Sequence, residues 1–253
     1  MKKHTRTRRR RTETKGQVTI PSAITPLLTQ IGQLADQQGL RAYAVGGCVR
    51  DWLLNTTNTP DLDLTVVGDG IAFARHVGAV YGVSVKSHEP FGTATLDMRR
   101  SRIRASEHRL QVTRGALRLD IATCRRERYA NPAAYPTVTA GTLKDDLFRR
   151  DFTVNAMAVA INRARFGALI DPFNGRRDLR ARRLRILHPN SFIDDPSRIL
   201  RAVRFTQRFG LTVERHTAQQ LRQAMADGML SFLNRGRLRK ERDRMAQEPT
   251  PGA

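Results

Sequence analysis

The chain has 253 residues and is strongly basic, with 45 Lys and Arg residues against 23 Asp and Glu residues and a net charge of +22. A hydrophobic content of 40% supports a folded core of one large or two modest domains, which argues against global disorder. No run of about 18 apolar residues is present, so we expect no membrane span. The charge instead indicates a polyanionic partner, first of all nucleic acid.

The N-terminal residues 1–22 are predicted to form a basic, disordered arm. Eight of the first fifteen residues are Lys or Arg, and such a segment cannot bury enough apolar surface to fold alone. No apolar run follows the basic cluster, so we expect no secretory signal. The cysteines, Cys48 and Cys124, are too few and too far apart for a disulfide framework or a zinc site, which indicates buried thiols and a cytoplasmic location.

Residues 23–170 are predicted to form a compact head built on a mixed β-sheet. A helix is expected after Pro26, where apolar side chains recur at helical spacing, and another at residues 71–81. Short apolar or alternating runs predict the strands: 42–45, 61–67, 83–85, 93–96 and 117–122. The segment 98–115 holds six arginines and one glutamate and is interpreted as a basic hairpin or loop at the rim of the head.

Residues 171–247 are predicted to form a short, all-helical neck. Asp194 is a candidate N-cap and Pro196 fits the first turn of a helix that runs to Phe209. Two more helices are expected at residues 214–226 and 229–247. The expected fold class is therefore α+β, with a mixed-sheet head followed by an all-helical neck.

Asp61 and Asp63 are the first candidate catalytic residues. They lie two apart in a predicted strand, so both carboxylates project from one face while Leu62 and Leu64 enter the core. Two parallel carboxylates suit a pair of Mg²⁺ ions whose remaining ligands are phosphate oxygens and water. Taken alone, this spacing also fits the solvent-facing side of an ordinary strand.

Residues 46–51 (GGCVRD) lie upstream of these carboxylates, where a strand turns into a helix. Gly46 and Gly47 would let backbone N–H groups approach a polyphosphate, and a helix N-terminus favours negative charge. Arg50 would add a fork of donors in the first turn. The alternative is that the two glycines form a tight turn without a ligand, but the position of this turn before the carboxylates favours a triphosphate site.

Four ordered motifs resemble one family. Residues 46–51 followed by 61–64 (DLDL), residues 149–158 (RRDFTVNAMA), residues 171–179 (DPFNGRRDL) and residues 194–205 (DDPSRILRAVRF) are similar to those of class II tRNA nucleotidyltransferases and bacterial poly(A) polymerases. These families belong to the polymerase-β-like superfamily. The resemblance covers about residues 40–210 and implies a nucleotidyltransferase head. Asp194 departs from it, since the family usually has glutamate there.

The resemblance implies roles for individual residues. Asp61 and Asp63 would hold two metal ions, and Asp120 matches the strand on which the superfamily carries a third acidic residue. The alternative for Asp120 is an ion pair with neighbouring arginines. Residues of the first two motifs would lie near the nucleotide: Gly46, Gly47 and Arg50 at the phosphates, Arg150 as a ligand, and Asp151 and Asn155 near the ribose.

Asp195 and Arg198 are the candidates for base selection. A carboxylate accepts from the amino group of adenine or cytosine while a guanidinium donates to the adjacent ring nitrogen, whereas guanine and uracil reverse this pattern. The resemblance assigns this role to the same two positions. The alternative is an i,i+3 salt bridge on a helix surface. Arg201 and Arg204 continue the helix face opposite Ile199 and Val203, either toward phosphates or as a solvated basic face.

The expected function is template-independent addition of CMP and AMP, from CTP and ATP, to the 3′ end of tRNA with release of pyrophosphate. Alternatives are a poly(A) polymerase, a specialist that adds only CC or only A, and a non-catalytic RNA-binding remnant. The family's body and tail regions beyond the neck are not recognised in this sequence. We therefore expect the basic segments 1–15 and 98–115 to supply part of the grip on tRNA, with a steep salt dependence.

Overall fold

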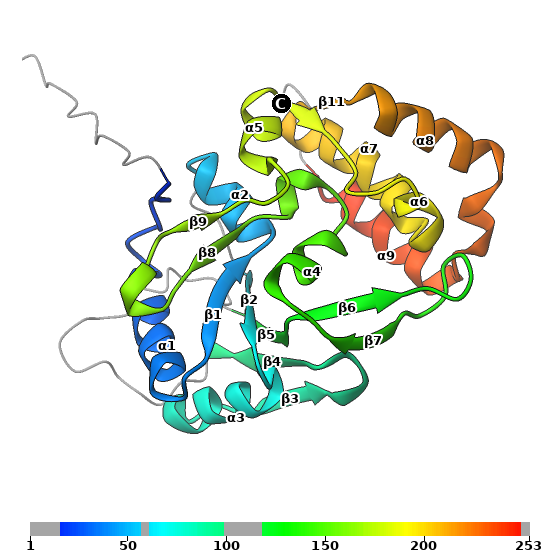
Figure 1. The fold of residues 1–253 in the computed structure, drawn as a ribbon. Helices are drawn as coiled ribbons and strands as arrows, with labels where there is room; N and C mark the ends of the chain where they lie inside the picture. The colour runs from blue at the N-terminus through cyan, green and yellow to red at the C-terminus, as the bar shows by residue number, and fades with distance from the viewer. Residues whose placement is uncertain (1–15, 57–60, 99–117, 249–253) are drawn as a thin grey trace, which may run out of the picture.

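The structure is a computed structural model that describes residues 16–56, 61–98 and 118–248 (Figure 1). Residues 1–15 and 99–117 are not among them. The predicted basic arm, apart from its last residues, and almost all of the predicted basic loop 98–115 therefore lie outside the described part of the chain.

A mixed sheet of seven strands forms the centre of the head. Its order is β3-β4-β5-β2-β1-β8-β9. The strands are β1 (Arg41–Val45), β2 (Asp61–Val67), β3 (Val85–His88), β4 (Thr93–Asp97), β5 (Arg118–Thr123), β8 (Ala158–Ala160) and β9 (Leu169–Ile170). β2 and β5 run parallel, and the other neighbouring pairs described in this sheet are antiparallel. The predicted mixed sheet is confirmed.

Both faces of the sheet are buried. Alternation along β1 sends Ala42 and Ala44 into the larger core beneath the helices, while Tyr43 and Val45 face a smaller cluster that includes Leu147. The helices of the head are α1 (Thr25–Gln37), α2 (Gly47–Leu53), α3 (Gly70–Tyr81) and α4 (Leu143–Phe148), with 3-10 turns η1 (Glu89–Phe91), η3 (Thr153–Asn155) and η4 (Arg163–Arg165). Figure 1 shows α1 and α3 together beside the sheet, with α4 apart from them.

The prediction that residues 1–22 form a disordered arm is wrong for the last of these residues. Gln17 forms an antiparallel bridge with Ala168, and the Val18 amide donates to the Gly167 carbonyl at 2.9 Å. Val18 is 7% exposed and belongs to the core. A valine beside the edge strand β9 gains apolar burial and backbone hydrogen bonds, so the folded head begins before residue 23.

A hairpin that the sequence did not predict lies beside the head. Its strands, β6 (Arg125–Arg128) and β7 (Thr137–Ala140), pair antiparallel. β6 consists of three arginines and one glutamate, so it lacks the apolar alternation by which strands are usually recognised. Ion pairs stabilise it instead, among them Arg149 with Glu127 at 3.0 Å.

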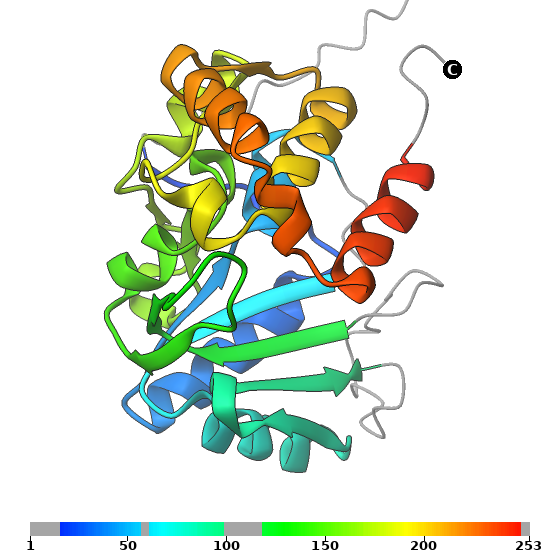
Figure 2. The same cartoon turned by 90° about the vertical axis from the view of Figure 1, so that its right-hand side faces the viewer.

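The region after the head is helical apart from one short parallel pair, β10 (Arg183–Leu184) and β11 (Thr212–Val213). Its helices are α5 (Gly175–Arg180), α6 (Ser191–Asp194), α7 (Ser197–Phe209), α8 (Arg215–Ala226), η5 (Met229–Phe232) and α9 (Arg235–Ala246). The helix expected from Asp194 begins at Ser197 instead, and the helix expected over 229–247 is interrupted, because the Asn234 side chain caps a new helix by accepting from the Arg237 amide at 2.9 Å. Figure 2 shows α7, α8 and α9 on the side of the sheet away from α3.

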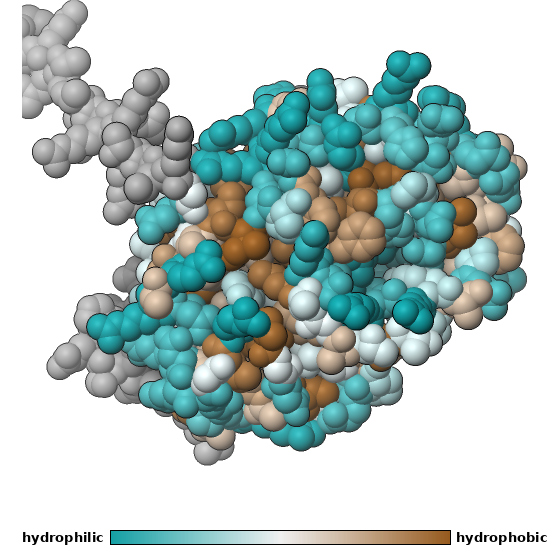
Figure 3. Space-filling model, in the orientation of Figure 1, coloured by the Kyte–Doolittle hydropathy of each residue, from teal (hydrophilic) through white to brown (hydrophobic). Residues whose placement is uncertain are grey.

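The surface agrees with the composition. Hydrophilic side chains dominate the face seen in Figure 3, and apolar side chains form separate patches among them. Within the described residues, no helix has the length and apolar character needed to cross a membrane. Cys48 and Cys124 are both buried free thiols, as predicted.

Candidate functional site

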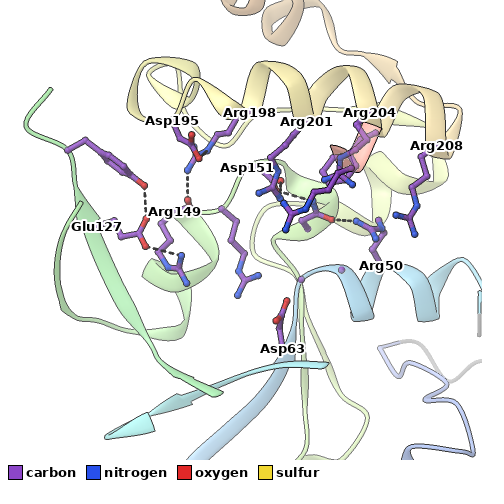
Figure 4. A pocket seen from close by; sticks show the side chains of 17 residues that line it. Arg50, Asp63, Glu127, Arg149, Asp151, Asp195, Arg198, Arg201, Arg204 and Arg208 are labelled. Carbon is purple, nitrogen blue, oxygen red and sulfur yellow. Dashed lines mark hydrogen bonds and ion pairs between the residues drawn. The ribbon is translucent and has the colours of Figure 1, made fainter. Parts of the chain in front are cut away.

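A cleft of about 440 Å³ lies between the sheet and α7 (Figure 4). The predicted catalytic residue Asp63 lines it together with all ten predicted nucleotide-binding residues: Gly46, Gly47, Arg50, Arg150, Asp151, Asn155, Asp195, Arg198, Arg201 and Arg204. Its walls contain eight arginines and four carboxylates, so the described lining carries an excess of positive charge. A cleft of this size and sign suits a nucleoside triphosphate.

The predicted catalytic carboxylates meet at the β2–β5 pair. Asp63 lies opposite Asp120 in register, and both line a second cavity of about 320 Å³ that adjoins the cleft. Leu62 and Leu64 are buried while Asp61 and Asp63 keep solvent access, as the strand pattern predicts. Asp61 lines neither cavity, although it is close enough for its charge to act on Asp63.

Asp120 is engaged by its neighbours. Its Oδ1 accepts from Thr95 Oγ1 at 2.5 Å and from Arg118 Nε at 3.1 Å, and its Oδ2 lies 3.0 Å from Arg118 Nη2. The alternative role for Asp120, an ion pair with a nearby arginine, is therefore present in this structure. The Arg118 side chain is exposed, and an exposed ion pair of this kind contributes little stability.

The electrostatics of Asp63 favour a bound cation. The surrounding protein desolvates the carboxyl and raises its pKa; Arg150 lowers it, while Asp120 and Asp61 raise it further. No cluster of three His, Cys, Asp or Glu side chains in the described part of the chain forms a complete metal cage. The donor set, hard carboxylate oxygens on neighbouring strands, nevertheless fits divalent ions that take their remaining ligands from phosphate and water.

Gly46 is required at the junction of β1 and α2. Its φ of 78° lies in the left-handed region, and its amide donates to the Met157 carbonyl at 3.2 Å. A Cβ at this position would lie 2.6 Å from Arg150 Nη1 and 3.8 Å from Asp63 Oδ2. The glycine therefore leaves room for the guanidinium of Arg150 at the start of α2, close enough to Asp63 for its charge to act on that carboxylate.

Arg50 is held by the protein on several sides. Its Nη1 donates to Asn155 Oδ1 at 2.6 Å, its Nε donates to Asp51 Oδ1 at 2.9 Å, and its guanidinium lies 4.2 Å from the centre of the Phe209 ring. It still borders the cleft. Arg50 thus links α2 to the end of α7, a role that the sequence motif alone did not indicate.

Asp151 joins the head to α7. This buried carboxylate accepts from the Phe152 amide at 2.7 Å and from Asn155 Nδ2 at 3.0 Å, and it forms an ion pair with Arg201. Burial alone would raise its pKa, but Arg201 and the hydrogen bonds hold the pKa below its usual range. Asp151 and Asn155 are thus committed to protein contacts, and their predicted proximity to a ribose stays a prediction.

Asp195 and Arg198 do not share a helix face. Asp195 has extended backbone angles, φ −137° and ψ 91°, between α6 and α7, and its Oδ1 accepts from the Ser197 amide at 3.0 Å. Arg198 is 4% exposed, and its Nε lies 4.0 Å from Asp195 Oδ2. The i,i+3 ion pair of the alternative is therefore present at 4.0 Å, but it faces the cleft rather than a helix surface, because Arg198 is buried.

The arginines that follow along α7 also face inward. Arg204 is buried, contacts Glu248 at 3.0 Å and lies over the Phe205 ring. Val203, expected on the apolar side of the helix, is instead 38% exposed. A solvated basic face is thus excluded for Arg204, because its guanidinium lies over an aromatic ring and its charge is paired.

Further cleft residues were not predicted from the sequence: Glu127, Tyr129, Arg149, Phe205 and Arg244. Arg208, which the helical spacing places on the basic face with Arg201 and Arg204, also lines the cleft. Arg149 and Phe205 stand inside recognised motifs, which was a signal available in the sequence. Glu127 and Tyr129 depend on the unpredicted hairpin, so no local pattern identified them.

A stability prediction arises at Asp146. This fully buried carboxylate accepts from Arg149 at 2.9 and 3.0 Å and from Arg150 at 3.1 Å. Burial would raise its pKa, but both arginines outweigh this and hold the pKa below its usual range. We expect Asp146→Asn to reduce the free energy of unfolding by roughly 3 kcal/mol at neutral pH, because two arginines lose their buried counter-charge.

The measurement is urea denaturation of wild type and variant across pH. A carboxylate with a lowered folded pKa stabilises the fold above its unfolded pKa, so the difference should shrink as the pH falls from the unfolded pKa through the lowered folded pKa. Asp243→Asn, on the exposed side of α9, is the control. Equal stabilities of the Asp146 variant and wild type at neutral pH would contradict the assigned ion pairs.

The sheet, the paired carboxylates and the arginine-lined cleft define a nucleotidyltransferase-like head. The profile of the poly A polymerase head domain matches residues 42–185, which is more than half of the chain. The chain belongs to this family.

Two proteins with similar sequences are named as tRNA nucleotidyltransferases. An A-adding tRNA nucleotidyltransferase of Geobacter sulfurreducens is 41% identical over 232 residues, 92% of this chain and 24% of the relative. A CC-adding tRNA nucleotidyltransferase of Deinococcus radiodurans is 36% identical over 82% of this chain and 50% of its own length. The chain thus spans half or less of each of these two proteins.

A solved structure shares the fold. It is a tRNA nucleotidyltransferase complexed with a primer tRNA and an incoming ATP analogue, with a TM-score of 0.70 and 43% identity. The match covers 84% of this chain and 55% of that one. The α+β fold and the mixed sheet that the sequence predicted agree with this similarity.

Proposed function

We propose that the chain transfers nucleotides from nucleoside triphosphates to the 3′ end of tRNA without a nucleic-acid template. The observation that carries this proposal is the position of Asp63. It lies where the arginine-lined cleft and the cavity at Asp120 meet, so a triphosphate in one and an RNA end in the other would share a carboxylate.

In the proposed reaction the RNA 3′-oxygen attacks the α-phosphorus, the bond from that phosphorus to the bridging oxygen breaks, and pyrophosphate leaves. Two Mg²⁺ ions bound by Asp61 and Asp63 would promote loss of the 3′-hydroxyl proton and neutralise the triphosphate. Arg150 lies against the Gly46 backbone, where its guanidinium can orient phosphate oxygens. Gly47 lines the cleft beside Gly46, and Arg201 and Arg204 add positive charge along α7.

We further propose that Asp195 and Arg198 read the base edge. In this arrangement Asp195 Oδ2 accepts from an exocyclic amino group and Arg198 donates to the adjacent ring nitrogen, which admits adenine and cytosine. Guanine and uracil would place donor against donor and acceptor against acceptor. Because Arg198 is buried, the mismatched donors would lack the water that relieves them at a surface.

Two candidate specificities follow. The first is addition of both CMP and AMP, as for a complete CCA end. The second is addition of AMP alone, which is favoured by the higher identity to the A-adding relative, 41% against 36% for the CC-adding one.

The test uses purified protein and three tRNA transcripts that lack CCA, lack only the final A, or are complete. CTP and ATP are supplied separately and together, and product lengths are read on a sequencing gel. Extension of the first transcript with both nucleotides supports CCA addition, whereas extension of only the second by one AMP supports A addition. Repeated ATP addition to unrelated RNA indicates a poly(A) polymerase. RNA binding without any extension rejects the proposed function and leaves the non-catalytic alternative.

A further inference from the structure

An arginine from the last helix contacts the carboxylate that we assign to base selection. Arg237, in the first turn of α9, places its Nη2 at 2.5 Å from Asp195 Oδ1 and donates from Nη1 to the Ala133 carbonyl at 3.0 Å. One side chain thus connects α9, the segment between α6 and α7, and the loop between β6 and β7. Neither the motifs nor the predicted roles include this residue.

The position of Arg237 is fixed by the packing of α9. Glu241 is buried, lies 3.7 Å from Arg204 Nε and accepts from Arg244 at 2.7 Å. Glu248 binds Arg204 and Arg208 at 3.0 and 3.3 Å. These contacts hold α9 along α7, so Arg237 reaches Asp195 from an anchored helix rather than from a free surface.

This contact determines which oxygen of Asp195 faces the cleft. Oδ1 accepts from the Ser197 amide and hydroxyl, at 3.0 and 2.6 Å, as well as binding Arg237. Oδ2 has as its nearest recorded cation the Nε of Arg198, at 4.0 Å, which is outside hydrogen-bond range. Oδ2 is therefore left as an acceptor for a ligand.

Arg198 is held in a matching way. Its Nη1 donates to Ser191 Oγ at 2.7 Å, and its Nη2 donates to the Arg149 carbonyl at 2.7 Å. Its Nε faces the 4.0 Å gap to Asp195. Asp195 Oδ2 and Arg198 Nε thus form an acceptor and a donor side by side. The remaining polar atoms of each side chain are held by other groups of the protein.

We propose that Arg237 is a positioning residue for base selection, an inference that rests on the proposed function. By binding Oδ1, Arg237 prevents the carboxylate from turning to close the 4.0 Å gap to Arg198. Without Arg237, Asp195 and Arg198 would approach to hydrogen-bond distance, and the base would have to break that hydrogen bond before binding. Loss of Arg237 should therefore weaken the binding of adenine and cytosine more than the binding of guanine and uracil.

The test compares Arg237→Ala and Arg237→Lys with Arg239→Ala, which removes an exposed arginine from the same helix. For each protein, kcat/KM is measured for all four nucleoside triphosphates with one tRNA acceptor, and the Kd of ATP and of GTP is measured without RNA. We expect Arg237→Ala to lower the ATP-to-GTP ratio of kcat/KM, and to raise the ATP-to-GTP ratio of Kd, each by about tenfold or more. Arg237→Lys keeps the charge but not the two-pronged contact, so its ratio should fall between those of wild type and Arg237→Ala.

The inference would be overturned if the nucleotide ratios of both Arg237 variants equalled those of wild type and Arg239→Ala. This holds even if overall activity falls, because a purely structural role lowers kcat/KM for all four nucleotides alike. Arg237→Lys provides this comparison if Arg237→Ala does not fold. A wild-type protein that binds RNA but adds no nucleotide rejects the proposed function itself. An active wild type with unchanged variant ratios rejects only the role of Arg237.

Discussion

Replacing Asp63 by alanine is expected to lower kcat/KM for nucleotide addition by more than about a thousandfold, because the proposed metal site loses a charge that stabilises the transition state. The same loss is expected for Asp61→Ala, whose carboxylate projects from the same strand face. Rates measured over a range of ATP concentrations at saturating Mg²⁺ would give kcat/KM for both variants. Near-normal turnover in either variant would reject the two-metal assignment.

The Asp63 variant should lose activity without losing stability. The folded protein raises the pKa of Asp63, so the folded state binds the proton more tightly than the unfolded state does. Stability therefore falls as pH rises through this raised pKa, and the ionised carboxylate is a destabilising element at neutral pH. We expect Asp63→Asn to unfold at a higher urea concentration than wild type at neutral pH, with the difference vanishing in acid. Lower stability of this variant would indicate a structural role for the carboxylate.

The carboxylate pair was predictable from sequence because it depends on local geometry. A strand places residues two apart on one face whatever its neighbours are, so Asp61 and Asp63 follow from the pattern alone. The pairing of Asp63 with Asp120 is different, because it requires β2 and β5 to be adjacent and parallel across an intervening pair of strands. Only the family resemblance, not the spacing, pointed to that neighbour.

The region of base selection shows what local reasoning cannot reach. Asp194 as a candidate N-cap, with Pro196 after it, suggested a helix from Asp194, whereas Asp195 has extended backbone angles and its Oδ1 accepts from the Ser197 amide. Asp side chains form such local bonds because they compete for backbone amides. Arg237 lies 42 positions further along the chain, and its contact with Asp195 depends on how α9 packs, which no spacing rule encodes.

The arginines of the cleft differ in how strongly the protein already holds them. Arg149 and Arg150 share the buried Asp146, and Arg201 pairs with Asp151. Such pairs keep the guanidinium groups fixed before a ligand arrives, which reduces the conformational entropy lost on binding. The cleft is thus preorganised for an anion by its carboxylates as well as by its arginines.

The second large effect is expected from Arg198→Ala. The substitution removes the donor that faces the cleft and also leaves the Ser191 hydroxyl and the Arg149 carbonyl without this partner. We expect kcat/KM for ATP to fall by about a hundredfold, while the values for GTP and UTP fall much less, since a good bidentate base contact contributes roughly 1–3 kcal/mol of discrimination. Specificity constants for all four nucleotides with one tRNA acceptor would measure the change.

Ser191→Ala separates base reading from folding, because it removes one contact behind Arg198 and leaves the guanidinium itself in place. A thermal melt should show that Ser191→Ala and Arg198→Ala are both folded at the assay temperature. If Ser191→Ala keeps the wild-type nucleotide ratios while Arg198→Ala loses them, the guanidinium reads the base. If Arg198→Ala slows all four nucleotides equally, Arg198 only supports the junction of α6 and α7, and base choice must come from other groups in the cleft.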